Sequence, residues 1–387
     1  MKSIESLNRF AQRNKREISF MKKFLLISPK NRSVYNFRGD LIKEIQSKGY
    51  EVVVTGPDRE NIDRVEALGV KFVEVPLKKN SVNVFSDLKY LNNLRKVIKQ
   101  EKPDVTLGYT IKPSIYGAMA AKMCKVKNIN SMITGGGYVF ASKTLKAKII
   151  RLFAFTLYKI GLACCNNVIF QNPDDKNDFI SNKLVKENKC HCVYGSGVNM
   201  EKYKIMPFPE KTTFFMLSRV MYSKGALEYL AAAEKVKKLY PDARFMLLGA
   251  IESIQDSLKR EEVMKYVESG VIDYYGETTD VTPYFAQSSV YCLPSYREGT
   301  PRTVLEAMSM GRPILTTDAP GCRQTVTEGE NGWLVPVKDA DSLAEKMIWY
   351  IENSEKIPEM GQKSYKLCEE RFDVRKVNAE MLLLMKI

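Results

Sequence analysis

The chain has 387 residues, which is too long for one typical core and suits two α/β domains. Its hydrophobic content of 44% is ordinary for a globular protein, and no run reaches the ~18 apolar residues of a transmembrane helix. The net charge of +15 is uneven, because residues 1–200 hold 35 Lys and Arg against 17 Asp and Glu, whereas residues 201–387 hold 25 against 28. The first half is therefore expected to face an anionic partner: nucleic acid, an anionic membrane or a lipid diphosphate.

Residues 1–21 are polar and charged and lack the apolar centre of a secretory signal, so we expect a loose extension. The eight cysteines include no C-x-x-C pair, which indicates reduced, mostly buried thiols of a cytosolic protein. Cys190-His191-Cys192 is the run closest to a metal site. A strand there would turn alternate side chains to opposite faces, and no second ligand pair is present, so we expect no metal.

The first half alternates short apolar runs with amphipathic stretches, which predicts a parallel sheet covered on both faces by helices. The expected strands are Phe24–Ser28, Glu51–Thr55, Phe72–Val75, Val105–Leu107, Ile129–Thr134, Val168–Phe170 and Cys192–Tyr194. The expected helices are Phe37–Ser47, Phe85–Gln100, Ser114–Cys124 and Leu145–Leu162.

The second half repeats the alternation. Its expected strands are Thr213–Leu217, Phe245–Leu248, Val271–Tyr275, Val290–Leu293 and Ile314–Thr316, and its expected helices are Lys224–Leu239, Ser253–Glu268, Thr303–Met310, Ser342–Glu352 and Ile357–Arg371. Glycine and proline punctuate the stretch from Gly195 to Pro209. We interpret this stretch as the linker between a domain of residues 22–198 and one of residues 199–373.

The most informative stretch, Ser295–Glu306, follows the expected strand Val290–Leu293. A turn at Gly299-Thr-Pro301 places Glu298 in the loop at the carboxyl end of a strand, and Glu306 inside the next helix. Open α/β sheets bind ligands at such loops. Two carboxylates there can hold several hydroxyls, as on a sugar and a ribose; a solvated loop glutamate and a solvated helix glutamate are the alternative.

The neighbouring residues carry a resemblance. Glu298 and Glu306, with Gly299-Thr-Pro301 between them, resemble the E-x7-E signature of family 4 retaining glycosyltransferases. Leu217–Gly225 is similar to the diphosphate-binding element of that family. Further matching segments are Thr317–Arg323 and Glu328–Pro336 in the second half.

In the first half, a narrower resemblance is to bacterial enzymes that build glycans on undecaprenyl diphosphate, including bacillosamine α-1,3-N-acetylgalactosaminyltransferases. The segments that carry it are Ser33–Arg38, Thr110–Pro113, Ile133–Phe140 and Phe170–Asp175. The resemblance implies the GT-B fold, in which two doubly wound, Rossmann-like domains face each other across a cleft. It also implies that residues 374–387 form a helix returning to the first domain.

The same resemblance implies a UDP-sugar as donor substrate, with no cofactor. Glu298, Arg219 and Lys224 are the expected catalytic residues, with the cations stabilising the diphosphate leaving group. The remaining expected donor contacts are Gly276, Gly299, Thr300, Pro301, Leu305 and Glu306. Asp339-Ala-Asp341 has the spacing of a metal-binding pair, but it precedes a helix and is better interpreted as a helix cap.

The chain departs from the wider family in its histidine. Many relatives place one beside the reacting sugar, whereas the only histidine here is His191, in a strand-like run before the linker. A front-face transfer needs no general base. The expected acceptor contacts are Arg38, Lys112, Gly135, Gly136 and Gly137, of which the glycines let a substrate approach the backbone closely.

Residues 142–162 combine basic residues with apolar positions spaced by three and four. Such a helix either packs its apolar side on the sheet or lies at the headgroup level of an anionic inner leaflet. The membrane contacts expected in the second case are Lys143, Lys146, Lys148 and Arg151.

We therefore predict a metal-independent, retaining glycosyltransferase that moves an N-acetylhexosamine from a UDP-sugar to an undecaprenyl-diphosphate-linked saccharide in capsule or other polysaccharide assembly. We expect a monomer, peripheral on the cytoplasmic face of the plasma membrane. A nucleotide-sugar 2-epimerase shares the architecture but lacks the paired-glutamate block. A basic nucleic-acid-binding protein would leave the glutamates without a role.

Overall fold

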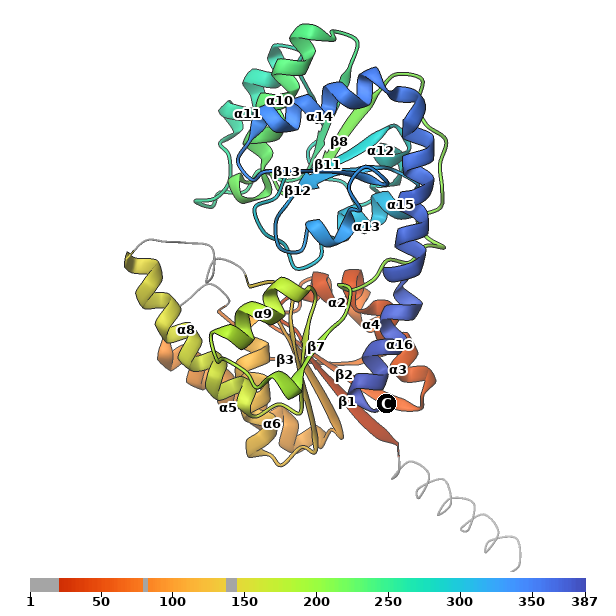
Figure 1. Ribbon diagram of the computed structural model, residues 1–387. Helices are drawn as coiled ribbons and strands as arrows, with labels where there is room; N and C mark the ends of the chain where they lie inside the picture. Colours follow the sequence, from red (N-terminus) through yellow and green to blue (C-terminus); the bar gives the residue numbers. More distant parts are fainter. Residues whose placement is uncertain (1–20, 79–82, 137–144) are drawn as a thin grey trace, which may run out of the picture.

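The computed structural model describes residues 21–78, 83–136 and 145–387, and these fold into two α/β domains stacked one above the other (Figure 1). The expected extension of residues 1–21 lies almost wholly outside the described residues.

The N-terminal domain holds a seven-stranded parallel sheet in the order β3-β2-β1-β4-β5-β6-β7. Its strands are β1 (Lys22–Ile27), β2 (Tyr50–Gly56), β3 (Lys71–Glu74), β4 (Val105–Tyr109), β5 (Asn128–Ile133), β6 (Asn167–Phe170) and β7 (Cys190–Cys192). Leu25 and Ile27 of β1 enter one core and Phe24 and Leu26 the other, because successive side chains of a strand point to opposite faces. Both faces of the sheet are thus buried, as the sequence predicts.

Helices cover each face of this sheet. The face of Leu25 is covered by α5 (Val84–Glu101), the π-helical turn η1 (Pro113–Gly117), α6 (Ala118–Met123) and α8 (Leu145–Ala163). The opposite face is covered by α2 (Asn31–Phe37), α3 (Gly39–Ser47), α4 (Ile62–Glu66) and the last helix of the chain, α16 (Val374–Met385). Helix α9 (Pro173–Ser181) and the 3-10 turn η2 (Glu187–Lys189) lie between β6 and β7.

The C-terminal domain holds a six-stranded parallel sheet in the order β10-β9-β8-β11-β12-β13. Its strands are β8 (Thr213–Leu217), β9 (Arg244–Leu248), β10 (Asp273–Tyr274), β11 (Val290–Leu293), β12 (Ile314–Thr317) and β13 (Gly332–Val335). Its helices are η3 (Tyr222–Lys224), α10 (Ala226–Leu239), α11 (Arg260–Glu268), α12 (Thr282–Ala286), α13 (Arg302–Ser309), η4 (Arg323–Thr325), α14 (Ala340–Glu352), η5 (Ser354–Lys356) and α15 (Ile357–Arg371).

Two crossings of the chain join the domains, and they lie side by side. Val198 N donates to Phe372 O at 2.7 Å, and Val374 N donates to Val198 O at 3.0 Å. At Gly197 φ is 65°, and a Cβ would lie 2.6 Å from Val374 Cα, so this approach requires glycine. After the second crossing α16 runs down beside α3, against the N-terminal domain (Figure 1).

Several expected elements differ from the observed ones. The helix expected over Phe37–Ser47 is two helices, α2 and α3, separated at Arg38. The helix expected from Ser253 begins only at Arg260, and Lys224 lies in the turn η3 rather than in α10. Asp339 accepts a hydrogen bond from Ser342 N at 2.9 Å, which confirms its assignment as the cap of α14.

Candidate active site

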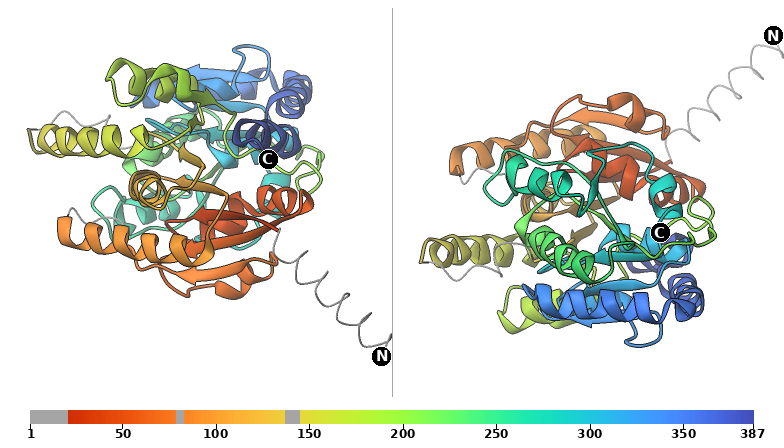
Figure 2. Two further views of the ribbon diagram at one scale, coloured as in Figure 1. Left: turned by 90° about the horizontal axis from the view of Figure 1, so that it is seen from below. Right: turned by 90° about the horizontal axis from the view of Figure 1, so that it is seen from above.

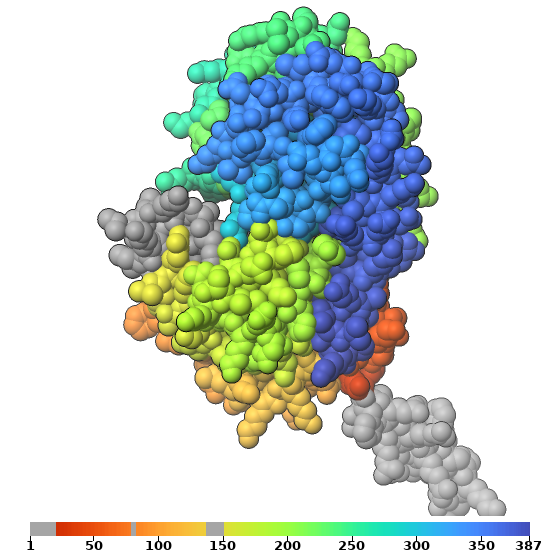
Figure 3. Space-filling model, viewed as in Figure 1, coloured from red at the N-terminus to blue at the C-terminus, as the bar shows by residue number. Residues whose placement is uncertain are grey.

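The loops at the carboxyl ends of the two sheets meet each other. In each sheet the strand order reverses, between β1 and β4 and between β8 and β11, which is where doubly wound sheets bind ligands. Thr300 Oγ1 donates to Gln171 O at 2.7 Å, and Arg32 pairs with Glu277 at 3.6 Å, so contacts cross between the domains. Figure 3 shows the domains in contact along this seam, where α9 lies against the C-terminal domain.

The centre of the site is an ion pair between loops of adjacent strands. Lys224 follows β8 and Glu298 follows β11, and Lys224 Nζ lies 2.5 Å from Glu298 Oε1. Ser295 Oγ donates to the same oxygen at 2.8 Å. The two side chains are only 22% and 13% exposed, so this pair lies in a partly dry position where charge interactions are strong. The structure therefore brings together two of the three predicted catalytic residues.

Arg219, the third predicted catalytic residue, is exposed in the loop after β8. Its Nη1 lies 3.2 Å from Glu252 Oε2. A bound diphosphate would compete with Glu252 for Arg219 and with Glu298 for Lys224. Both cations thus stand on one loop, with carboxylate partners that an anionic ligand can replace.

Glu306 lies on α13 and is almost completely buried. Arg302 Nε lies 3.3 Å from its Oε1, and Tyr203 of the linker is hydrogen-bonded to it. Burial raises the pKa of Glu306, although Arg302 and Tyr203 oppose that effect. Leu305 beside it has its side chain packed in the core, which leaves its backbone for the predicted donor contact.

The turn after Glu298 presses against the N-terminal domain. A Cβ on Gly299 would lie 2.3 Å from Thr134 O, so only glycine fits this contact. Gly135 lies on the opposite side, with φ of 130°. Thr300 and Pro301 follow Gly299, with Pro301 as the cap residue of α13, while Gly276 occupies the loop after β10.

The predicted acceptor residues are less accessible than expected. Arg38 is 3% exposed, donates to Ser196 Oγ at 3.0 Å and lies over the ring of Tyr109; burial lowers the pKa of Arg38 to about 10. Lys112 Nζ lies 2.6 Å from Asp87 Oδ1, so it is part of an internal ion pair. Gly136 is described, whereas Gly137 lies outside the described residues.

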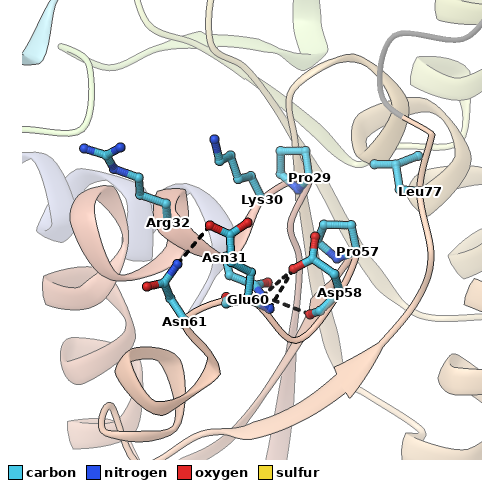
Figure 4. Close-up of a pocket in the computed structure, with 9 residues that line it drawn as sticks. All are labelled: Pro29, Lys30, Asn31, Arg32, Pro57, Asp58, Glu60, Asn61 and Leu77. Atoms are coloured by element: carbon cyan, nitrogen blue, oxygen red, sulfur yellow. Dashed lines mark hydrogen bonds between the residues drawn. The ribbon is translucent and has the colours of Figure 1, made fainter. Parts of the chain in front are cut away.

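A pocket of about 190 Å³ opens at the carboxyl ends of β1 and β2. Asn31 forms its base and donates to Asp58 O and to Glu60 O, each at 2.9 Å (Figure 4). Lys30 and Arg32 also line it, and Arg32 is the residue that pairs with Glu277 of the other domain. The pocket therefore borders the interdomain contact and offers hydroxyl-binding groups of both charges.

Comparison with known proteins gives the family. Residues 200–367 match the family described as glycosyl transferases group 1, and residues 23–172 match the family described as glycosyl transferase 4-like. The two matches cover most of both domains. The chain is a member of the glycosyltransferases.

Two relatives illustrate its place in this family. The N,N'-diacetylbacillosaminyl-diphospho-undecaprenol alpha-1,3-N-acetylgalactosaminyltransferase of Campylobacter jejuni is 28% identical over 83% of this chain and 87% of its own length. The UDP-Gal:alpha-D-GlcNAc-diphosphoundecaprenol alpha-1,3-galactosyltransferase of Escherichia coli is 26% identical over 71% of this chain and 73% of its own.

Solved structures show the same fold. The glycosyltransferase of Rickettsia africae superimposes with a TM-score of 0.75, at 16% identity, over 95% of this chain and 98% of its own. Anabaena HepE in complex with UDP and glucose superimposes with a TM-score of 0.76, at 16% identity, over 94% of this chain and 99% of its own. The predicted GT-B architecture is confirmed.

The sequence analysis assigned no role to a set of polar residues that lie between the domains of the glycosyltransferase. Asn172 Nδ2 donates to Gly299 O at 2.6 Å, and Arg297 contacts the buried Asp175. Near the edge of the seam, Arg323 Nη1 lies 2.6 Å from Asp174 Oδ1. Asn172-Pro-Asp-Asp175 carries the local signal of a helix start, but nothing local reveals the partners in the other domain.

Helix α8 packs one side against the N-terminal core and exposes apolar side chains elsewhere. Tyr158 and Leu162 are buried in the core, whereas Leu152 is 72% exposed and Phe153 is 40% exposed. Arg151 is half-buried, the side chains of Lys146 and Lys148 are not described, and Lys143 lies outside the described residues.

Two further findings concern the described part of the chain. No helix in it is both long enough and apolar enough to span a bilayer. It also contains no cluster of three or more His, Cys, Asp or Glu side chains arranged to hold a metal ion, and the cysteines are free thiols.

Proposed function

We propose that the enzyme transfers an N-acetylhexosamine from a UDP-sugar to a saccharide carried on undecaprenyl diphosphate, with retention of anomeric configuration. The observation that carries this proposal is the contact between Glu298 and Lys224 at the carboxyl ends of β11 and β8, facing the glycines after β5. The C. jejuni and E. coli relatives, whose names specify undecaprenol-linked acceptors, support the choice of substrate.

In the proposed reaction the diphosphate displaces the carboxylate partners of Arg219 and Lys224. The cations then stabilise the negative charge that grows on the leaving phosphate oxygen. Glu298, released from Lys224, accepts hydrogen bonds from hydroxyls of the donor sugar. Glu306 accepts from the ribose once Arg302 and Tyr203 give way.

The transfer itself asks for no basic side chain. The bond between the anomeric carbon and the phosphate oxygen breaks, and a bond to the acceptor oxygen forms on the same face. The acceptor's proton passes to the departing phosphate oxygen. His191 lies within β7, in the N-terminal sheet, and has no part in this proposed step.

We propose that turnover needs no metal or other cofactor, because Arg219 and Lys224 supply the cationic charge that a divalent ion supplies elsewhere. Transfer should therefore continue in excess chelator. Loss of turnover on chelation, restored by Mg²⁺ or Mn²⁺, would contradict this part of the proposal.

The acceptor is proposed to reach the site from the cytoplasmic face of the plasma membrane, along the N-terminal domain. Residues 75–172 contain 16 Lys and Arg against three Asp and Glu. Helices α5 and α8 extend to the same side of the molecule (Figure 2). Phe85 on α5 is 85% exposed, and Leu152 on α8 is 72% exposed. Apolar side chains within a basic surface suit an anionic leaflet.

Vesicle sedimentation tests this surface. Phe85→Ser and Leu152→Ser should weaken binding to vesicles with anionic lipid, and salt should weaken binding of the unaltered protein. Leu239→Ser is the matched control, because Leu239 is 67% exposed in the C-terminal domain. Equal binding by all three variants would argue against the proposed surface.

The function is tested with a panel of UDP- and GDP-sugars, with and without a short-chain polyprenyl-diphosphate saccharide. Acceptor-dependent release of UDP from one donor supports the transferase and identifies the sugar. Interconversion of UDP-sugars without acceptor would make the protein an epimerase instead.

A further inference from the structure

Asp175 is a buried carboxylate at the contact between the two domains. It is 0% exposed, near the start of α9. Its Oδ1 accepts from Gly136 N at 3.1 Å and from Arg297 Nε at 3.2 Å. One oxygen atom thus joins the glycine loop of the N-terminal domain to the residue that precedes Glu298.

Asn172 reinforces this connection from the helix cap. Its Oδ1 accepts from Asp175 N at 2.8 Å, which caps α9. Its Nδ2 donates to Asp175 Oδ2 at 2.9 Å, to Gly299 O at 2.6 Å and to Glu298 O at 3.3 Å. The backbone on which Glu298 is carried is therefore hydrogen-bonded directly to the N-terminal domain.

Ion pairs of Arg297 also hold the two domains together. A buried carboxylate is costly unless it is paired and hydrogen-bonded. Arg297 pairs with both Asp175 and Asp178, at 16% exposure of its own side chain. Burial alone would lower the pKa of Arg297, but its hydrogen bonds to Asp175 and Asp178 leave that pKa raised. The pair forms only when the loop after β11 lies against α9.

We propose that Asp175 and Asn172 are positioning residues, which hold the Glu298 loop in register with the Gly135–Gly136 loop so that donor and acceptor are aligned. This rests on the proposed function, in which Glu298 holds the donor sugar. Asp175 is buried and acts through Arg297 and Gly136, with no contact to substrate. Its loss should affect transfer much more than nucleotide binding.

The test compares Asp175→Asn with Asp174→Asn. The two changes are adjacent, remove the same charge and each break one ion pair between the domains. Only Asp175, however, accepts hydrogen bonds from Gly136 N and from the side chain of Arg297. Asp175→Asn should lower kcat for transfer by about 100-fold, the cost of misplacing reacting groups by about 1 Å. The Kd for UDP should not change. A larger share of consumed donor should be hydrolysed rather than transferred. Asp174→Asn should behave as the unaltered enzyme in all three measurements.

Asn172→Ser provides a second variant, because serine keeps a cap for α9 but is too short for its single hydroxyl to replace the amide bonds to Glu298 O and Gly299 O. It should reproduce the Asp175→Asn pattern. Amide hydrogen exchange gives a readout independent of turnover: exchange at Gly136 and over residues 296–300 should accelerate in both variants and not in Asp174→Asn.

The outcomes separate the two proposals. Absence of transfer by the unaltered enzyme would reject the proposed function. Amide hydrogen exchange would then be the only test of whether Asp175 and Asn172 hold the two loops in place. Unaltered exchange in Asp175→Asn and Asn172→Ser would overturn the inference. So would equal losses of transfer, UDP binding and Tm, because they would indicate a purely structural role.

Discussion

Replacing Gly299 with alanine should separate the two domains at the reaction site while leaving each domain folded. The three atoms nearest an ideal Cβ on Gly299 all belong to the N-terminal domain: Thr134 O at 2.3 Å, Gln171 Oε1 at 2.7 Å and Thr134 C at 2.8 Å. Ordinary contact begins at 3.4 Å, so Thr134 O and residue 299 must move apart by about 1.1 Å, from 2.3 to 3.4 Å. The φ angle of Gly299 lies outside the left-handed region, so alanine adds no backbone strain of its own.

A displacement of about 1 Å in a group-transfer site costs on the order of 100-fold in rate. We therefore expect kcat for sugar transfer to fall about 100-fold in Gly299→Ala. The Kd for UDP, measured by calorimetry, should be unchanged, because Arg219, Lys224 and Glu306 all lie within the C-terminal domain. Gly39→Ala is the control, since its Cβ would meet only Leu68 Cδ2, at 3.5 Å. If Gly299→Ala turned over as fast as Gly39→Ala, the contact between Gly299 and Thr134 would have no part in the reacting arrangement.

Three further variants test separate parts of the site. Lys224→Ala removes the cation beside Glu298 and should lower kcat by about 100-fold in steady-state assays; normal turnover would remove Lys224 from the mechanism. Glu306→Ala should raise the KM for the donor more than it lowers kcat, whereas Glu298→Ala should chiefly lower kcat; full activity in both would refute their assignment. Burial and Lys176 lower the pKa of His191 below its usual value of 6.5. Stability from neutral His191 is therefore complete above pH 6.5 and lost as the pH falls below it, so His191→Gln should flatten that part of the pH profile in urea unfolding. An identical pH profile in the variant would show that protonation of His191 does not cause the loss of stability.

The sequence predicted the buried strands well because their composition is decisive. The bounds of β8 and β11 match the expected Thr213–Leu217 and Val290–Leu293. Apart from Thr213, every residue of the two strands is apolar, as expected for strands covered on both faces. The position of Glu298 after β11 and of Lys224 after β8 followed from these bounds. The Glu298–Lys224 contact then required only that β8 and β11 be neighbours.

The helix boundaries depended on tertiary contacts that a single sequence does not reveal. The only local signal for the break at Arg38 is Gly39, which follows it and begins α3. The guanidinium of Arg38 is buried against Tyr109 and Ser196, which come from β4 and the linker. Strand β13 was missed because its four residues begin with a glycine and include a half-exposed tryptophan.

The interdomain contacts were beyond sequence reasoning for a different reason. Asp175 and Arg297 are 122 residues apart, and their pairing depends on how two independently wound sheets are oriented. Leu305 was expected at the donor because of its place in the motif. Its helix turns it into the core, while Glu306, one residue on, faces Arg302.

Because α16 is the last helix of the chain but packs on the N-terminal domain, this domain can complete its core only at the end of synthesis. Met381, Leu382 and Met385 belong to the N-terminal core, and Asn128 and Asn167 of the N-terminal sheet donate to Met385 O and Leu384 O. These residues leave the ribosome after the whole C-terminal domain. The core of the N-terminal domain therefore stays incomplete during translation. One face of its sheet remains partly uncovered until the residues after the second crossing have been synthesised. Deleting α16 would leave the part of that face beside α3 exposed permanently. The loss would be about 2–5 kcal/mol for each large apolar side chain removed from the core, and the sum would exceed the free energy of unfolding of many domains.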